Sequence, residues 1–158
     1  MNSVSPTAFI ERYSIDYLRG ASTLGALSED ALLYLINQGE LLEMTVGETL
    51  FRMDDPVDCF YVILDGSIAF YKPCNEGRTH IRDYNFGMEL GFVAMIGLHN
   101  RVGDAEAAMP TIILKVTCDL FNDLHQHLPN DFGILLLNLS REMSRRLRDA
   151  DERLANVE

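Results

Sequence analysis

The sequence predicts a mainly β protein with flanking helices: an antiparallel β-roll or jelly-roll barrel plus N-terminal helices and a long C-terminal helix. Residues 41–72 alternate with a period of two and are rich in β-branched and aromatic side chains. Turn signals divide this region and the residues after it into short strands at regular spacing. Toward the C-terminus the apolar residues recur with the period of a helix.

The first 40 residues predict helices. Ser28 is followed by two acidic residues, which is typical of a helix N-cap and of the positive end of a helix dipole. We therefore expect a helix within residues 27–40, and a shorter one over residues 9–18. Three apolar residues of the first of these share one face: Leu32, Leu35 and Ile36.

The strands are predicted from two apolar runs and the turns around them. "GETLFRM" (47–53) precedes "CFYVILDGSIAFYK" (59–72), which contains the pair Asp65-Gly66. An Asp-Gly pair between two such runs indicates a hairpin, so we expect the strands on either side to pair. The sequence "CNEG" predicts a second turn, and further strands are expected at residues 78–84 and 111–116.

Two helices are predicted to follow the strands. Thr117 is expected to cap the first, Pro129 to end it, and Asn130 to cap a longer helix from residue 131 to about 156. Opposite charges four residues apart, such as Glu142 and Arg146, are expected to pair along it. Because one barrel is too small to cover this helix, its apolar stripe predicts a homodimer. The stripe consists of Leu136, Leu139, Met143, Leu147, Ala150 and Leu154.

Composition argues against several classes of function and location. The chain has 158 residues, which suits one domain, and its net charge of -11 argues against nucleic-acid and anionic-membrane partners. No signal peptide and no apolar run of membrane-spanning length are present in the sequence. The three cysteines show no CxxC spacing, which indicates reduced thiols and a cytoplasmic protein.

No enzyme or metal site is predicted. His125 and His127 are two residues apart on a predicted helix and therefore point in different directions, so no metal is expected. Cys74 and His80 could be drawn as a nucleophile and a base, but the sequence suggests no third member for them. Paired carboxylates suited to acid–base chemistry are not evident either.

Residues 46–72 resemble the first half of a cyclic-nucleotide-binding domain, and residues 139–157 are similar to the dimer helix of catabolite-activator-type bacterial regulators. The resemblance covers about residues 27–158 and implies three segments. These are an N-terminal helical segment (1–26), a cyclic-nucleotide-binding-like β-roll (27–129) and a dimer or lid helix (130–158). In those regulators a helix-turn-helix follows, and its absence from this sequence predicts a stand-alone domain without operator binding. The matching residues of the first half are Gly47, Glu48, Asp54, Asp55, Phe60, Tyr61, Val62 and Gly66.

The resemblance also implies a ligand cradle. Glu89 corresponds to the carboxylate that accepts a ribose hydroxyl, and Arg101 to the guanidinium that neutralises the cyclic phosphate. On the long helix, Ala150 and Asp151 occupy the positions that face the base. The implied ligand-binding residues are Gly87, Met88, Glu89, Leu90, Gly91, Arg101, Val102 and Gly103.

Two hypotheses follow. The first is a sensor domain that binds cAMP in preference to cGMP and signals through its C-terminal helix to a dimer or a partner protein. The second is a dimerisation or protein-interaction module of the same fold that has lost its ligand. Three departures from the family pattern motivate the second: Met88 where a glycine is usual, Val102 without a hydroxyl, and Asp104 with a negative charge near the phosphate position.

Overall fold

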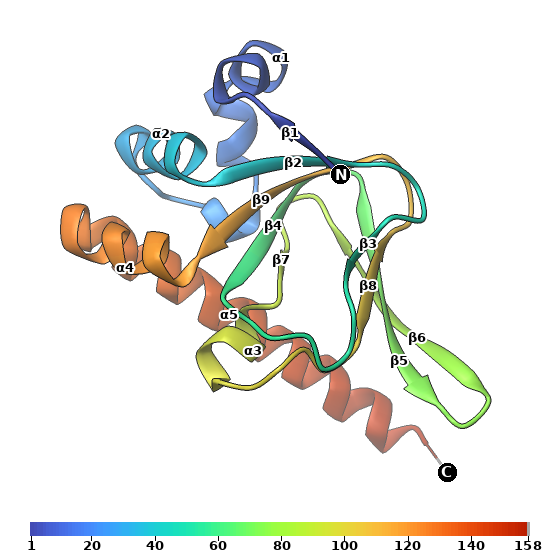
Figure 1. Cartoon of the computed structure of the whole chain (residues 1–158). Coiled ribbons are helices and arrows are strands. Elements are labelled where there is room, and N and C mark those ends of the chain that lie inside the picture. Colours follow the sequence, from blue (N-terminus) through green and yellow to red (C-terminus); the bar gives the residue numbers. More distant parts are fainter. Residues whose placement is uncertain (158) are drawn as a thin grey trace.

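The computed structural model describes residues 1–157 and contains two β-sheets and a set of helices (Figure 1). The predicted C-terminal segment ends at residue 158, which lies outside the described residues. The strands are β1 (Asn2–Val4), β2 (Glu40–Met44), β3 (Thr49–Phe51), β4 (Cys59–Asp65), β5 (Ser67–Cys74), β6 (Gly77–Asn85), β7 (Glu89–Leu90), β8 (Asp104–Ala107) and β9 (Thr111–Thr117). The helices are α1 (Pro6–Arg19), the 3-10 turn η1 (Ser22–Leu24), α2 (Glu29–Gln38), α3 (Phe92–Gly97), α4 (Cys118–His127) and α5 (Pro129–Ala155).

The strands form one five-stranded sheet and one four-stranded sheet. Their orders are β1-β2-β9-β4-β7 and β3-β8-β5-β6, and the pairings are antiparallel. The two sheets face each other around a shared interior (Figure 1). The predicted β-roll with flanking helices is therefore confirmed.

The Asp65-Gly66 pair does not close a hairpin, so that prediction was wrong. β4 pairs with β7 and β9, whereas β5 pairs with β6 and β8, and the turn carries the chain from one sheet to the other. Gly66 has a φ of 90°, and a Cβ there would lie 2.4 Å from the carbonyl oxygen of Pro110. The position is a tight corner that requires glycine. The turn after Cys74 does close a hairpin, between β5 and β6.

β4 is buried on both faces and separates two apolar clusters. Its residues Phe60, Val62 and Leu64 face the helices, because alternate side chains of a strand point to opposite faces. Cys59, Tyr61 and Ile63 face the interior of the barrel. On the helix side, the Phe60 ring meets those of Phe92 and Phe121 edge to face, at centroid distances of 5.4 and 5.8 Å.

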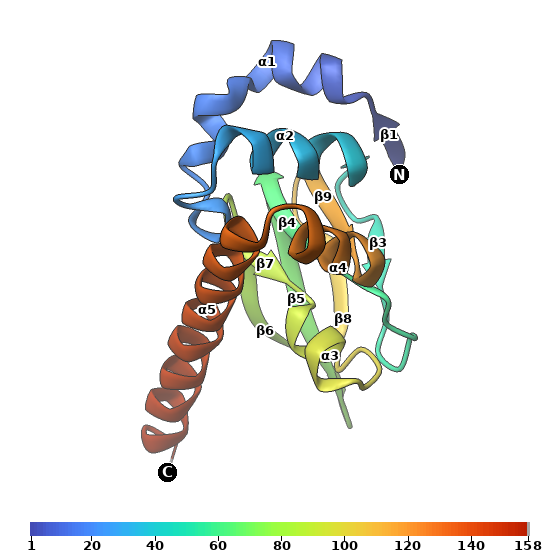
Figure 2. The same ribbon diagram turned by 90° about the vertical axis from the view of Figure 1, so that its left-hand side faces the viewer.

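The helices cover the outer face of the five-stranded sheet (Figure 2). Ser28 and Thr117 cap α2 and α4 as predicted, because their hydroxyls accept hydrogen bonds from the first turn of each helix. Asn130 is not a cap: Pro129 is already the first residue of α5, a position where proline costs no hydrogen bond. The second half of α5 runs beside β6 (Figure 2), and Arg153 near its end donates a hydrogen bond to the carbonyl oxygen of Ile81 at 2.8 Å.

In the part of the chain that the structure describes, none of the helices combines the length and the apolar character needed to cross a membrane.

Candidate functional site

Glu89 is a fully buried carboxylate at one end of the barrel. It lies on the two-residue strand β7, whose pairing with β4 places it opposite Val62. One carboxylate oxygen accepts a hydrogen bond from the amide of Phe92 at 3.1 Å, at the start of α3. The other oxygen forms an ion pair with Arg146 of α5. Glu89 therefore connects the barrel to the C-terminal helix.

Arg101 is buried in the same region, with 4% of its surface exposed. Its guanidinium donates hydrogen bonds to the carbonyl oxygens of Gly91 (3.1 Å) and Cys59 (2.8 Å). It also lies 4.3 Å from the centroid of the Phe51 ring, a favourable cation–π contact. Its Nε has no hydrogen-bond partner among residues 1–157, and no carboxylate of that range forms an ion pair with it. Neutral partners thus surround a buried positive charge, an arrangement that loses hydration without gaining a counter-ion.

The groups beside Arg101 cannot supply the missing negative charge at neutral pH. Burial raises the pKa of the Cys59 thiol above its ordinary value. Burial also raises the pKa of the Tyr61 hydroxyl, and the neighbouring Cys59 adds to the effect. Neither group therefore supplies a counter-ion to Arg101 at neutral pH.

Gly91 makes room for this arginine. It has a φ of 94° and precedes α3, and a Cβ at this position would lie 2.2 Å from Nη1 of Arg101. Any other residue would be strained and would displace the guanidinium. Gly103 is required for a different reason. A Cβ there would lie 2.5 Å from the Phe70 ring, so close packing against β5 leaves no room for a side chain.

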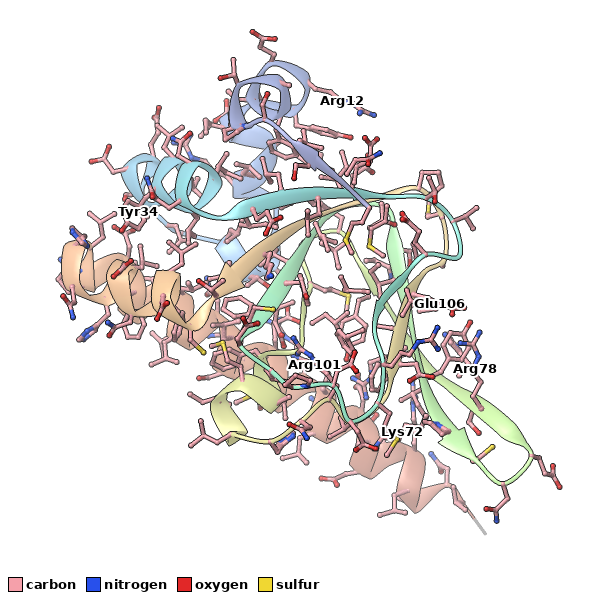
Figure 3. The ribbon with its side chains drawn as sticks, in the orientation of Figure 1. Arg12, Tyr34, Lys72, Arg78, Arg101 and Glu106 are labelled. Atoms are coloured by element: carbon pink, nitrogen blue, oxygen red, sulfur yellow. The ribbon has the colours of Figure 1, made fainter. Side chains whose placement is uncertain are left out.

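A cavity of about 250 Å³ lies between β5, β6, α3 and α5, and Arg101 forms part of its wall. In Figure 3, Arg101 lies between the strands and α3, at the same end of the barrel as Lys72. Four cations line the cavity, and no Asp or Glu of the described chain does. The cations are Lys72, Arg82, Arg101 and Arg146; the apolar wall includes Phe51, Phe70, Tyr84, Leu90, Val93 and Ala94.

The structure divides the predicted cradle residues into two groups. The residues that line the cavity are Leu90, Gly91, Arg101 and Val102. Glu89 is buried outside the cavity wall, where it forms its ion pair with Arg146. Gly87 lies elsewhere, because its carbonyl binds the amide of residue 23 in η1 and a Cβ on it would meet the backbone of residues 21 and 22. Gly103 packs on the strands as described.

The side chains of Met88 and Asp104 do not fill the cavity. Met88 lines a neighbouring groove, and its sulfur accepts a hydrogen bond from the amide of Asn85 at 3.3 Å. Asp104 accepts a hydrogen bond from the amide of Met53 at 2.8 Å and is not among the cavity's lining residues. Neither the charge of Asp104 nor the bulk of Met88 therefore forms part of the cavity wall.

Arg146 is one of the site residues that the sequence did not reveal, together with Lys72 and Arg82 of the cavity wall. Helical spacing predicted that Arg146 would pair with Glu142, but Glu142 instead contacts Arg145 at 3.3 Å. Arg146 turns toward the barrel, where it pairs with Glu89 and donates to the Tyr84 hydroxyl at 3.4 Å. Only the docking of α5 against β6 shows this, and local spacing carries no such signal.

The residues of the predicted dimer seam on α5 differ in how exposed they are. Leu139 is fully buried in the protein's own core, so its assignment to a dimer seam was wrong. Met143 is partly buried against the same core. Leu136, Leu147 and Leu154 are exposed, at 37%, 65% and 72%. Ala150 and Asp151, the expected base-side residues, are also exposed and do not line the cavity.

The comparisons with known proteins agree with this geometry. The sequence profile described as "Cyclic nucleotide-binding domain" matches residues 41–127, more than half of the chain. The chain belongs to the cyclic nucleotide-binding domain family. The predicted resemblance is thereby confirmed, and both Glu89 and the cavity residue Arg101 lie within the matched residues.

Relatives of known structure share the fold. A cyclic nucleotide-binding domain from Methylobacillus flagellatus KT superposes with a TM-score of 0.81 at 21% identity, covering 97% of this chain and 85% of its own. The catabolite activator protein of Thermus thermophilus gives a TM-score of 0.72 at 20% identity, covering 85% of this chain and 62% of its own. At these identities the likeness establishes the fold.

Among curated proteins, the chain is similar to lysophospholipase nte1 of Neurospora crassa. The two are 26% identical over 140 residues, which is 88% of this chain and 9% of that protein. Lysophospholipase NTE1 of Chaetomium globosum is 25% identical over the same coverage. The chain therefore spans only about a tenth of the length of these relatives.

Proposed function

We propose that the protein is a regulatory domain whose cavity binds a cyclic nucleotide. The single observation that supports this most strongly is Arg101, a buried guanidinium to which residues 1–157 provide no counter-ion, in the wall of a cavity that no carboxylate of those residues lines. A cyclic phosphate would provide that counter-ion through charge-assisted hydrogen bonds to the guanidinium. Glu89 would accept a hydrogen bond from a ribose hydroxyl.

The same geometry suggests how binding would be signalled. Glu89 is already paired with Arg146, so a ribose at Glu89 would compete with the contact that holds α5 to the barrel. A ligand shifts a conformational equilibrium only if it binds the two states with different affinities, and this competition provides such a difference. We therefore propose that ligand binding moves α5.

We further propose that α5 carries the signal to a second copy of the chain. Leu136, Leu147 and Leu154 are exposed on α5, and burying such side chains against a partner is favourable. A substitution Leu147→Asp would then shift a dimer to monomer in analytical ultracentrifugation. A dimer that resists this change would place the interface elsewhere.

The preferred base is proposed from the residue beside the arginine. Val102 lines the cavity and offers no hydroxyl to a guanine, which favours cAMP over cGMP. A structural neighbour, the regulatory subunit of a cAMP-independent protein kinase A from Trypanosoma brucei, is named as a triple mutant bound to cAMP and gives a TM-score of 0.66 at 20% identity. A cytoplasmic location is in keeping with the three free cysteines.

Catalysis is not part of the proposal. The curated relatives are named lysophospholipases, but this chain spans 9% of their length and carries the cyclic nucleotide-binding domain. We propose a binding and regulatory role for the segment and ascribe no hydrolysis to it.

Calorimetry tests the binding proposal. cAMP and cGMP are titrated into the wild type, into Arg101→Ala and into Arg19→Ala, in which an exposed arginine of α1 is removed. We expect heat of binding with the wild type and Arg19→Ala, and its loss with Arg101→Ala. No heat with either nucleotide up to millimolar concentration would refute the proposal.

The ligand-free alternative has one observation in its favour. Glu89 and Arg101 already have partners within the protein, namely Arg146 and the carbonyls of Gly91 and Cys59. Under this alternative the melting temperature would not respond to nucleotide, although the dimer would persist. An increase of several degrees with added cAMP would exclude it.

A further inference from the structure

The cavity holds more positive charge than one phosphate requires. Of its four cations, Arg146 is neutralised by Glu89, which leaves Lys72, Arg82 and Arg101. None of these three forms an ion pair with another residue in the range 1–157. A cyclic mononucleotide carries a single phosphodiester and would neutralise only one of them.

Lys72 and Arg82 lie on neighbouring strands at the outer part of the cavity. β5 and β6 are paired, with Phe70 opposite Arg82 and Lys72 opposite Thr79. Phe70 also lines the cavity, so the two cations and this ring share one face of the sheet. Lys72 is exposed and Arg82 is half-buried, in contrast to the buried Arg101. The two therefore form a basic pair nearer to solvent.

The cavity continues into a larger groove beside Arg82. This groove has a volume of about 560 Å³ and shares Ile81, Arg82 and Arg146 with the cavity. It provides room for a ligand that extends beyond one nucleotide. Its wall contains the carboxylates of Asp83, Glu142 and Asp149, whereas no carboxylate from the described part of the chain lines the cavity. A second anion would therefore be favoured on the cavity side of Arg82, next to Lys72.

We propose that Lys72 and Arg82 form a second anion subsite, so that the ligand is a nucleotide with two separate phosphate groups. This inference rests on the proposed function, because it takes Arg101 as the first phosphate subsite. Two phosphates match the excess charge better than one, and the groove accommodates the second nucleoside of a cyclic dinucleotide. A linear nucleotide bisphosphate shares the same chemistry.

The test compares ligands across charge-removal variants. Cyclic di-AMP, cyclic di-GMP, adenosine 3′,5′-bisphosphate and cAMP are titrated into the wild type, Lys72→Ala/Arg82→Ala and Arg101→Ala. The control Arg12→Ala/Arg19→Ala removes two exposed cations from α1. Because Lys72 and Arg82 are not buried, we expect their removal to leave the fold intact, which circular dichroism verifies. The cyclic dinucleotides and the bisphosphate distinguish the two sources of a second phosphate.

We expect a two-phosphate ligand to bind the wild type at least about tenfold more tightly than cAMP, since hydrogen bonds to charged groups are worth that much or more. Lys72→Ala/Arg82→Ala should remove this advantage and leave cAMP affinity within about threefold, while the control changes neither. If cAMP binds as tightly as every two-phosphate ligand, or the double variant weakens all ligands equally, the second subsite is refuted and the proposed function stands. If none of the four ligands binds, the proposed function is refuted as well.

Discussion

β4 contributes side chains to two interiors, which differ in the charged residues that are buried there. Toward the helices it presents Phe60 and Val62 to a cluster of apolar residues. Toward the barrel it presents Cys59 and Tyr61, and there the chain also buries Arg101. Glu89, opposite Val62 at the same end, is buried with a charged partner, Arg146. The helix side is stabilised by apolar burial, whereas the barrel side retains in Arg101 a buried charge that opposes folding.

Two polar side chains of α5 are matched by the protein itself on the helix side, although the buried Thr23 hydroxyl there has no hydrogen-bond partner among residues 1–157. Asn138 of α5 donates to the carbonyl oxygens of Thr23 and Gly25, and Glu142 accepts from Ser22. At the cavity end, Nε of Arg101 is left without a partner among residues 1–157. We infer from this contrast that the helix side serves the fold, and we propose that the cavity end binds a ligand. The following substitutions test this division, from the largest expected effect on stability to the smallest.

Phe60→Ala should be the most destabilising change. It removes a fully buried ring that contacts two other rings, and such truncations cost about 3–5 kcal/mol of unfolding free energy. Urea denaturation measures this cost. Leu137→Ala, on an exposed side chain of α5, is the control and should change stability by less than about 0.5 kcal/mol. Equal losses would show that the helix side is not the stabilising layer.

Arg146→Met should be next. It leaves Glu89 buried without its partner, and breaking a buried pair costs about 3–5 kcal/mol; because 14% of the Arg146 side chain is exposed, we expect about 2–3 kcal/mol. Glu89→Gln combined with Arg146→Met removes both charges and should recover most of the loss. If the single and double variants are equally unstable, the loss comes from packing and not from the unpaired carboxylate.

Gly91→Ala should destabilise by about 1–3 kcal/mol, because alanine at a φ of 94° is strained and its Cβ meets Arg101. The displaced guanidinium should also lose the ligand. Gly133→Ala is the matched control: no atom lies within 4 Å of its added Cβ, and within α5 the change should stabilise by about 0.5–1 kcal/mol. Normal nucleotide binding by Gly91→Ala would show that the binding site does not require this glycine.

Arg101→Met should separate stability from binding. It replaces a buried, uncompensated cation with an apolar side chain, so unfolding free energy should stay constant or rise by about 1 kcal/mol. Nucleotide binding should disappear. A variant that unfolds easily would show that Arg101 is part of the structural core, contrary to the division drawn here.

The smallest effect is expected at alkaline pH on the helix side. Burial, together with its hydrogen bond to Asp65 (2.6 Å), raises the pKa of the Tyr13 hydroxyl from 10.0 to about 12. Because the folded protein holds this proton more tightly than the unfolded chain, the contribution is present below pH 10 and is lost as the pH rises through 12. Tyr13→Phe should therefore lose less stability than the wild type between pH 9 and pH 11 in urea titrations. Identical losses of stability in Tyr13→Phe and the wild type would show that Tyr13 does not cause the pH dependence.

Local features were predictable from the sequence. The caps Ser28 and Thr117 depend on residues within one turn, and the strands depend on a period of two. The positions of Glu89 and Arg101 came from the family pattern, and the structure places both at one end of the barrel.

Features that depend on residues far apart in the chain were not predictable from the sequence. The Asp65-Gly66 turn is local, but the sheet that each flanking strand joins is decided by its partners elsewhere in the chain. The α5 stripe showed that Leu139 is apolar but not whether its cover comes from the same chain. Arg146 looked like a helix-surface residue because its partner, Glu89, is 57 positions away in sequence.

The most direct test is a crystal structure grown with saturating cAMP. We predict a phosphate oxygen about 2.7–2.9 Å from the Arg101 guanidinium, a ribose hydroxyl on Glu89, and Arg146 moved from its contact with Glu89. A nucleotide bound elsewhere, or a cavity in which Arg101 still contacts only Gly91 and Cys59 at that concentration, would contradict the account.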